Sequence, residues 1–241
     1  MADAKIRLYV DHPLAGGQSV PLTEDQARYL FAVMRLQPGA LVLLFNGRDG
    51  EWLAEVAEAG KRGGRLVCQS QTRRLQAPPD LWLVFAPVKK ARTDFIVEKA
   101  VELGVARILP VQTHFTNSER LRADRQQAHA VEAAEQCGAT FVPEVAELQP
   151  LDRLLAGWPA GRRILWCNEA KAGVATALAG QPAGPWAILI GPEGGFSDRE
   201  RAKLAALPQV VEASLGPRIL RAETAALAAL TLWQSALGDW K

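Results

Sequence analysis

Residues 186–197 read WAILIGPEGGFS, and residues 215–225 read LGPRILRAETA. The first stretch starts with four apolar residues in a row, 187–190, a pattern typical of a strand that is buried on both faces. A glycine-rich loop follows, and glycines let backbone N–H groups approach a ligand with no Cβ in the way. Ser197 and Glu200 form a capping box, which predicts a helix whose N-terminus faces the loop. The order of strand, loop and helix indicates an α/β fold.

The second stretch repeats this arrangement. Residues 210–213 are predicted to form a strand, and a second glycine loop leads into an alanine-rich helix. Loops at the ends of neighbouring strands are where open α/β sheets bind ligands. Each loop alone is equally well a simple turn, but the pair favours a site because Arg221, Glu223 and Thr224 reach the same edge. Neither loop matches the phosphate-binding motifs G-x-x-x-x-G-K-[ST] or G-x-G-x-x-G.

Composition narrows the class of protein. The chain has 241 residues, 49% of them hydrophobic, and a net charge of +2. The length and the hydrophobic fraction predict one large or two modest folded domains. Because the net charge is small, any contact with nucleic acid must depend on local clusters of basic residues. Cys68, Cys137 and Cys167 lie far apart without a C-x-x-C motif, which favours reduced thiols in the cytoplasm and no metal site. No signal peptide and no apolar run of about 20 residues is recognised, so we expect a soluble cytoplasmic protein without a membrane partner.

The first 74 residues have the features of a small β-barrel. Apolar alternation and glycine turns predict short strands at 6–10, 41–45, 51–56 and 66–71. Thr23 and Gln26 are expected to cap a short helix that runs to about Met34. Its predicted buried positions are Tyr29, Leu30 and Val33.

Basic residues gather near the end of this region without an acidic neighbour in the stretch. They either form a solvated edge or contact phosphates, since Lys and Arg neutralise backbone charge without needing sequence information. The cluster comprises Lys61, Arg62, Arg65, Arg73 and Arg74. A linker at 75–80, with the stiff pair Pro78 and Pro79, separates the domain 1–74 from a second domain, 81–241.

From residue 81 strands alternate with helices, which predicts a parallel sheet covered on both faces. The expected strands are 81–86, 107–111, 141–145, 164–167, 187–190 and 210–213. Lys89, Lys90 and Arg92 precede a helix that ends at Gly104, and a second helix spans 124–136. The last helix is apolar on nearly every side and requires burial, which a subunit interface would supply.

The two glycine stretches resemble the signature blocks of the RsmE-type ribosomal RNA uridine N3-methyltransferases, a family of the SPOUT class. Residues 99–105 with 108–110, and residues 132–136 with Pro143, are similar to two further blocks of that family. Residues 33–36 with Pro38 and Gly39 are similar to its barrel domain. The resemblance covers nearly the whole chain.

This resemblance implies a PUA-like β-barrel followed by an α/β domain whose C-terminal part forms a deep trefoil knot. It implies S-adenosyl-L-methionine as methyl donor, a homodimer through the knotted domain, and no metal. The expected substrate is 16S ribosomal RNA within the small ribosomal subunit, near the decoding region, and the expected product is 3-methyluridine.

The expected roles follow from these blocks. The backbone of both loops would surround the cofactor, and Glu193 would either accept a hydrogen bond from it or brace the loop. Glu169 would form a third wall, and Thr224 would mainly cap the last helix. The cofactor-binding set is therefore Glu169, Gly191, Glu193, Gly194, Gly195, Leu215, Gly216, Ile219, Leu220 and Thr224.

Catalysis requires uracil N3 to lose a proton. Glu223 is the candidate base, and Arg221 is the candidate cation that stabilises the resulting anion. The alternative is a structural ion pair between these two residues. The expected RNA contacts are Arg7, Arg35, Arg62, Arg65, Arg73, Arg74, Lys89, Lys90 and Arg92.

The chain departs from the family pattern at Tyr29, where His is frequent, and at Ala139, where Arg is usual. Both departures concern RNA contact more than the reaction. Two other functions stay open: a ribose 2′-O-methyltransferase of the SPOUT class, and a non-catalytic RNA-binding assembly factor that kept the fold.

Overall fold

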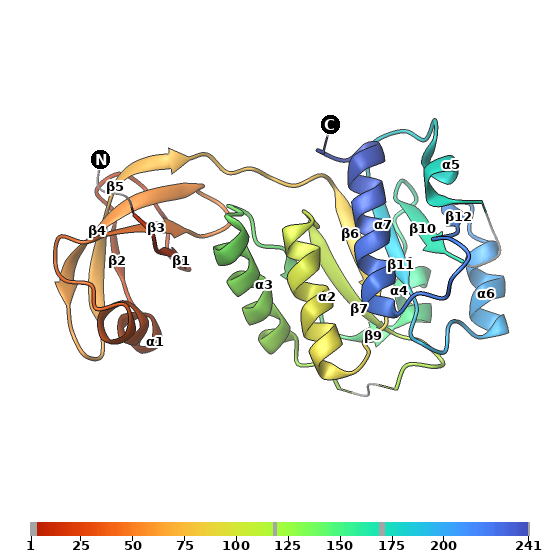
Figure 1. Cartoon of the computed structure of the whole chain (residues 1–241), viewed down its shortest axis with the longest axis horizontal. Helices are drawn as coiled ribbons and strands as arrows, with labels where there is room; N and C mark the ends of the chain where they lie inside the picture. The colour runs from red at the N-terminus through yellow and green to blue at the C-terminus, as the bar shows by residue number, and fades with distance from the viewer. Residues whose placement is uncertain (1–3, 118–119, 169–171, 241) are drawn as a thin grey trace. The chain divides into compact units, whose positions relative to one another are not determined.

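The chain forms two compact units in the computed structural model, which describes residues 4–117, 120–168 and 172–240. The N-terminal unit comprises Met1–Ala77 together with Ala134–Val142. The α/β unit comprises Pro78–Ala133 and Pro143–Lys241. Figure 1 shows the strands of the first unit in red to orange and those of the second in yellow to blue.

The N-terminal unit is built on one curled five-stranded sheet (Figure 1). Its strands, in the spatial order β1-β3-β4-β5-β2, are β1 (Arg7–Tyr9), β3 (Leu41–Phe45), β4 (Glu51–Ala59), β5 (Gly64–Arg73) and β2 (Ser19–Pro21). Alternate residues of these strands point inward and form an apolar core that includes Leu8, Leu44 and Leu66. The predicted small barrel is thus confirmed, and the sequence missed only the three-residue strand β2.

The helix of this unit changes character after its first turn. The predicted capping box is confirmed, because the Thr23 hydroxyl accepts from the Gln26 backbone and the Gln26 side chain accepts from Thr23. After α1 (Glu24–Ala27) the chain continues as a π-helix, η1 (Arg28–Val33). A π-helix has more residues per turn than an α-helix, so the buried face shifts along the sequence.

This shift explains which residues are buried. Leu30 is fully buried as expected, but Tyr29 is 40% exposed and Val33 is 64% exposed. The expectation that these two side chains are buried was therefore wrong. Arg35, just after the helix, has φ of +56°, the left-handed region that costs a non-glycine residue energy.

The α/β unit contains the predicted parallel sheet. Its strands follow the spatial order β12-β10-β11-β6-β7-β8, and the short β9 (Gln149–Pro150) also pairs with β7. All these pairings are parallel. The strands are β6 (Leu81–Phe85), β7 (Arg107–Gln112), β8 (Glu144–Val145), β10 (Arg163–Cys167), β11 (Trp186–Ile190) and β12 (Val210–Ala213).

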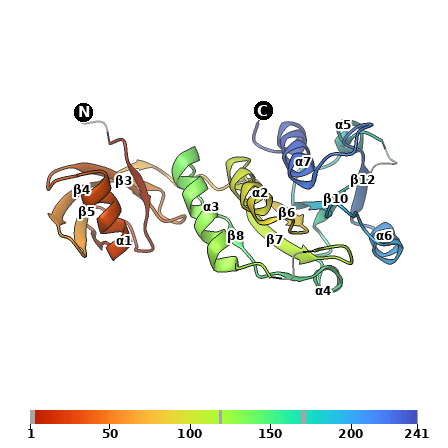
Figure 2. The same cartoon turned by 60° about the horizontal axis from the view of Figure 1, so that its bottom comes forward.

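Helices cover both faces of this sheet, as predicted. In Figure 2, α2 (Lys90–Glu102) and α7 (Ala222–Leu237) lie on one side, and α4 (Leu151–Ala156) and α6 (Asp198–Ala205) lie on the other. The core on the α4 and α6 side joins Leu151 and Leu204 to inward-facing strand residues such as Val84 and Leu189. The remaining helices are α3 (Ala123–Cys137) and α5 (Val174–Leu178).

The last helix buries most of its apolar side chains against other elements of the same chain. Helix α7 packs against α2, α5 and β11, and Leu230 and Trp233 are almost completely buried. The buried Gln234 amide donates a hydrogen bond to the Leu103 carbonyl, 2.6 Å away. A subunit interface is therefore not needed to cover this face, although Leu232 on α7 is 40% exposed.

Candidate functional site

The two glycine loops together line one cavity of about 260 Å³ in the α/β unit, which we call the loop cavity. The first loop follows β11 and the second follows β12, so both leave the sheet at the carboxyl ends of its strands. Eight of the ten residues expected to bind cofactor line it: Gly191, Glu193, Gly194, Gly195, Leu215, Gly216, Ile219 and Leu220.

The first loop is held by a carboxylate at the start of α6. Glu200 accepts from the Ser197 backbone, at 2.8 Å, and from the backbone N–H of His114, also at 2.8 Å. The capping box is thus confirmed, and it ties the loop to the segment that follows β7. Gly194 lies against that segment, because an added Cβ would stand 2.9 Å from the Phe115 Cβ. Only glycine fits this close approach.

The second loop is fixed by Ser214. Its backbone N–H donates to the Ala172 carbonyl at 2.7 Å, and its hydroxyl accepts from the Gly216 N–H at 3.2 Å. Gly216 has φ of +107°, a conformation that side-chain-bearing residues rarely adopt. Ile219 is 84% exposed and presents an apolar side chain at the cavity.

Arg92 contacts one acidic residue of the first loop and one of the first turn of α7. Its guanidinium lies 3.5 Å from a carboxylate oxygen of Glu193 and 3.5 Å from one of Glu223. The other oxygen of Glu223 is buried and has no hydrogen-bond partner in the described part of the chain. The sequence placed Arg92 among the RNA contacts, and it offered an ion pair of Glu223 with Arg221 as the alternative to their catalytic roles. The structure instead gives Glu223 the ion partner Arg92.

The other predicted site residues lie outside the loop cavity or outside the described residues. Arg221 is exposed and is the N-cap residue of α7, with no side-chain capping bond. The expectation that Thr224 caps this helix was therefore wrong, because Thr224 lies within it and is exposed. Glu169 falls outside the described residues.

Several cavity residues were missed by the sequence analysis. These residues line the loop cavity together with the glycines, and they include Trp166, Asn168, Phe196, Arg201 and Arg218. Asn168 directly follows β10, so the rule that selected Glu169 could also have selected its neighbour. Burial raises the pKa of the Cys167 thiol in the same cavity to about 12, which keeps it protonated at neutral pH.

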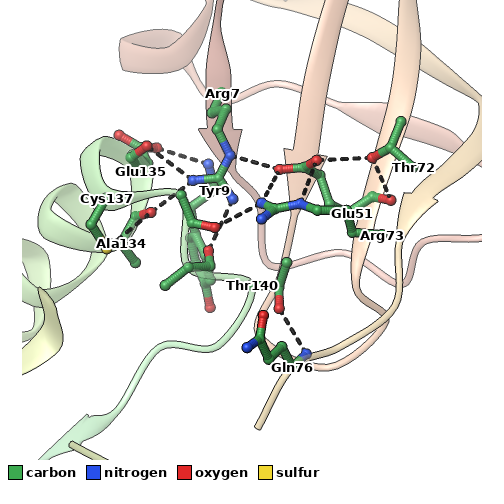
Figure 3. A network of polar contacts seen from close by, with 12 residues as sticks. Arg7, Tyr9, Glu51, Thr72, Arg73, Gln76, Ala134, Glu135, Cys137 and Thr140 are labelled. Carbon is green, nitrogen blue, oxygen red and sulfur yellow. Dashed lines mark hydrogen bonds and ion pairs between the residues drawn. The ribbon is translucent and has the colours of Figure 1, made fainter. Parts of the chain in front are cut away.

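Two of the predicted RNA-contacting arginines have internal partners in the N-terminal unit (Figure 3). Arg7 donates to a carboxylate oxygen of Glu51 and to three backbone carbonyls, those of Ala134, Glu135 and Ala139, all at 2.7–2.9 Å. Arg73 donates to the same carboxylate and to the Gly138 carbonyl at 2.7 Å. These carbonyls belong to the last turn of α3 and the residues after it, which lack partners within the helix.

Glu51 is the centre of this network. Burial alone would raise the pKa of its carboxyl, but hydrogen bonds from Arg73, Arg7 and Thr72 outweigh burial and lower that pKa to about 2. Arg7 has a side chain only 13% exposed, so its guanidinium is used inside the protein. A structural role is therefore favoured for Arg7 and Arg73.

The remaining predicted RNA contacts are on the surface. Arg65 forms an ion pair with Glu58, and Arg62, Arg74, Arg35, Lys89 and Lys90 are exposed. Among residues 4–117, 120–168 and 172–240, no group of three His, Cys, Asp or Glu side chains could hold a metal ion. None of the helices described there is long and apolar enough to cross a membrane.

Comparison with known proteins defines the class. Residues 76–234 match the family model of the RNA methyltransferase domain, and residues 22–67 match the RNA methyltransferase PUA domain. Since the first match spans more than half of the chain, the protein belongs to the RNA methyltransferase family, and the resemblance drawn from the sequence is confirmed.

Individual relatives share the whole architecture. The chain is 28% identical over 231 residues to a protein of Rickettsia conorii named ribosomal RNA small subunit methyltransferase E, with 93% of each chain covered. A crystal structure of the Neisseria gonorrhoeae protein of the same name, bound to S-adenosyl methionine, is 28% identical, with a TM-score of 0.89 and coverage of 98% and 99%. A methyltransferase from Legionella pneumophila, also in complex with that cofactor, is 29% identical with a TM-score of 0.86, and covers 97% of this chain and 98% of its own.

Proposed function

We propose that the protein transfers a methyl group from S-adenosyl-L-methionine to N3 of a specific uridine in 16S ribosomal RNA of the small ribosomal subunit. The observation that carries the proposal is the loop cavity, formed by both family glycine loops at the carboxyl ends of β11 and β12. The names of the relatives, and the cofactor bound to two of them, point to the same substrate and cofactor.

The residues of the loop cavity fit this cofactor. Apolar side chains of Leu215, Ile219 and Leu220 suit an adenine ring, and the glycine backbone offers hydrogen-bonding groups without a Cβ in the way. The polar groups of Asn168 and Glu193 suit the ribose and the amino-acid part. When bound, the cofactor supplies an electrophilic methyl group.

The residues beside the cavity are proposed to prepare the uracil. Glu223 accepts the N3 proton, because its side chain is 18% exposed beside the second loop and Arg92 orients one of its oxygens. Arg221 is exposed at the start of α7 and stabilises the negative charge that spreads over N3 and the neighbouring carbonyls. The N3–H bond would break with its proton leaving on Glu223, and N3 would form the new bond to the methyl carbon as the bond from that carbon to the cofactor sulfur breaks, which leaves a neutral thioether as the second product.

The two parts of the chain are proposed to divide the work. Residues 1–74 form an RNA-binding domain, 75–80 are the linker, and 81–241 carry the methyltransferase site. Arg35, Arg62, Arg65 and Arg74 contact RNA from the first domain. The trefoil knot, a homodimer through the knotted domain and a cytoplasmic location complete the proposal.

Methylation of isolated small subunits tests the function. The protein should transfer one labelled methyl group per unmethylated subunit, and nucleoside analysis after digestion should identify 3-methyluridine. A 2′-O-methylated nucleoside would instead establish the ribose methyltransferase. Absence of cofactor binding by calorimetry, together with binding to the subunit, would establish the non-catalytic assembly factor.

A further inference from the structure

A second cavity of the α/β unit, of about 190 Å³, shares no lining residue with the loop cavity. It lies between the N-terminal turn of α2 and the segment that leads into α3. Among the described residues, its lining contains four cations and one carboxylate: Lys90, Arg120, Arg122 and Arg125, with Asp94. We call it the basic cavity. Only Lys90 of these cations was expected to contact RNA.

The one carboxylate of the basic cavity is already neutralised. Asp94 lies 3.0 Å from the Arg125 guanidinium, accepts from the Gln126 amide at 2.7 Å, and stands 3.6 Å from His129. Arg122 pairs at the surface with Asp124. Among the ion pairs of residues 4–117, 120–168 and 172–240, none involves Lys90 or Arg120. The cavity therefore keeps a surplus of positive charge.

The start of α2 adds to this charge. The N-terminus of a helix carries a partial positive charge and is usually stabilised by an acidic or capping side chain. Helix α2 has thirteen residues, no side-chain cap and no acidic residue in its first turn, and it starts instead at Lys89 and Lys90. A cation at this end is unfavourable unless an anion binds there.

The interior of the basic cavity contains an unused acceptor. Gln126 is 3% exposed, and its amide nitrogen is used by Asp94. Its amide oxygen is buried without a hydrogen-bond partner in the described part of the chain. An unpaired buried acceptor destabilises the folded protein, and a donor that enters the cavity would relieve this effect.

We propose that the basic cavity binds a phosphate of the RNA strand close to the target uridine, together with the hydroxyl of the attached ribose. Phosphate satisfies the cations and the helix N-terminus, and the 2′-hydroxyl is the donor that RNA offers beside it. Arg92, in the first turn of the same helix, contacts Glu193 and Glu223 of the methyltransferase site. The strand held in the basic cavity is thereby presented to that site. This inference rests on the proposed function.

The test uses the full chain with the charges of two cavity residues removed, Lys90→Gln with Arg120→Gln, because neither side chain forms an ion pair with another described residue. The control is Arg153→Gln with Arg199→Gln, two exposed cations of the same unit that line neither cavity. Arg199 makes one ion contact, 3.7 Å from Asp152 at the surface, and its loss should matter little. Binding to isolated small subunits is measured from 50 to 300 mM KCl, and cofactor affinity is measured by calorimetry.

The cavity variant should bind subunits about tenfold more weakly at the lowest salt, with a salt slope smaller by about 1 to 2, while the control keeps both values. Cofactor affinity should be unchanged in both. Equal slopes and affinities in the cavity variant and wild type would overturn the basic cavity as a phosphate site. A wild-type protein that methylates no subunit would instead overturn the proposed function.

A second variant tests whether the site accepts a nucleotide or only a small anion. Gln126→Met should weaken subunit binding severalfold without changing the salt slope, because it removes the acceptor for the ribose hydroxyl and no charge. Inorganic phosphate at 10 mM, compared with chloride at equal ionic strength, should compete with subunits in the wild type and less in the cavity variant. Unchanged binding by Gln126→Met would remove the ribose contact from the proposal.

Discussion

Two groups of basic residues, one in each unit, have different partners. In the N-terminal unit, Arg7 and Arg73 direct their guanidinium groups to buried Glu51 and to carbonyls at the end of α3. In the α/β unit, Lys90 and Arg120 line a cavity in which Asp94, the one carboxylate among its described lining residues, is already paired. The protein itself supplies acceptors to the first group, and the second has capacity for a ligand.

The number of cations in a stretch of sequence therefore does not reveal their role. Arg73 and Arg74 are neighbours in the chain and both are exposed, yet Arg73 forms an ion pair with Glu51 and Arg74 forms none among the described residues. A guanidinium can make five hydrogen bonds, so it suits both helix carbonyls and phosphates. What separates the two roles is whether the protein already supplies the acceptors.

The largest effect is expected when the contacts of the first group are broken. Arg7→Met removes three hydrogen bonds to carbonyls at and just after the end of α3. It also leaves the Glu51 carboxylate with the Arg73 guanidinium but without that of Arg7. Removing one partner of a buried ion pair costs about 3–5 kcal/mol, so we expect a loss of that order in the free energy of unfolding. Urea denaturation of the full chain measures it.

Arg28→Met is the matched control, since Arg28 forms an exposed ion pair with Asp25 in the same unit. Its effect should stay within about 0.5 kcal/mol. If Arg7→Met kept wild-type stability and lost subunit binding, Arg7 would return to the RNA contacts and the comparison would fail.

The next effect concerns pH. The pKa of Glu51 is lowered from 4.5 to about 2, so its contribution to stability is fully present above pH 4.5 and is lost as pH falls towards 2. The stability difference between wild type and Glu51→Gln should therefore shrink between pH 5 and pH 2, by on the order of 2 kcal/mol. A difference that is constant from pH 7 to pH 3 would show that the pKa of Glu51 is the same in the folded and the unfolded protein, so that its partners do not lower it.

Much of the fold could be predicted from the sequence, because its signals are local. Apolar runs such as 187–190 and capping boxes at Ser197 and Thr23 determine strands and helix starts wherever they lie, and all three were confirmed. The π-helix after Ala27 could not be predicted, since no cap, glycine or proline in the sequence marks the change from the α-helix. It moved Tyr29 and Val33 to the surface.

The loops of the candidate site could be located, but not the partners of its charged residues. Glycine loops after strands predict a cavity edge, and eight expected residues line it. Glu223 and Arg92 are 131 positions apart in the chain, and the sequence around either residue does not indicate that the two form an ion pair. The same holds for Arg7, whose acceptors on α3 are invisible in the pattern around it.

A smaller effect on stability, with a large effect on rate, is expected at Arg92. Its side chain is 32% exposed and both of its ion contacts are 3.5 Å long, so Arg92→Gln should cost less than about 1 kcal/mol. If it orients Glu223, the single-turnover methylation rate should fall about tenfold or more while cofactor affinity changes little. Arg92→Lys should restore part of the rate, because it keeps the charge and loses the planar geometry. A wild-type rate in Arg92→Gln would leave Arg92 as a structural contact only.

The smallest effect on stability is expected at the exposed cations of the N-terminal unit. Arg62→Gln with Arg74→Gln changes two exposed side chains, so the free energy of unfolding should stay within about 0.5 kcal/mol of wild type. If these residues contact phosphates, subunit binding should weaken and its salt slope should fall by about 1 to 2, as for the basic cavity. Combining this pair with Lys90→Gln and Arg120→Gln should give additive losses, since the two pairs neutralise different phosphates. The contrary outcome is that Arg62→Gln with Arg74→Gln leaves affinity and salt slope at wild-type values, while Lys90→Gln with Arg120→Gln lowers both. In that case Arg62 and Arg74 are only solvated, and of the two pairs only the one in the α/β unit contacts RNA phosphates.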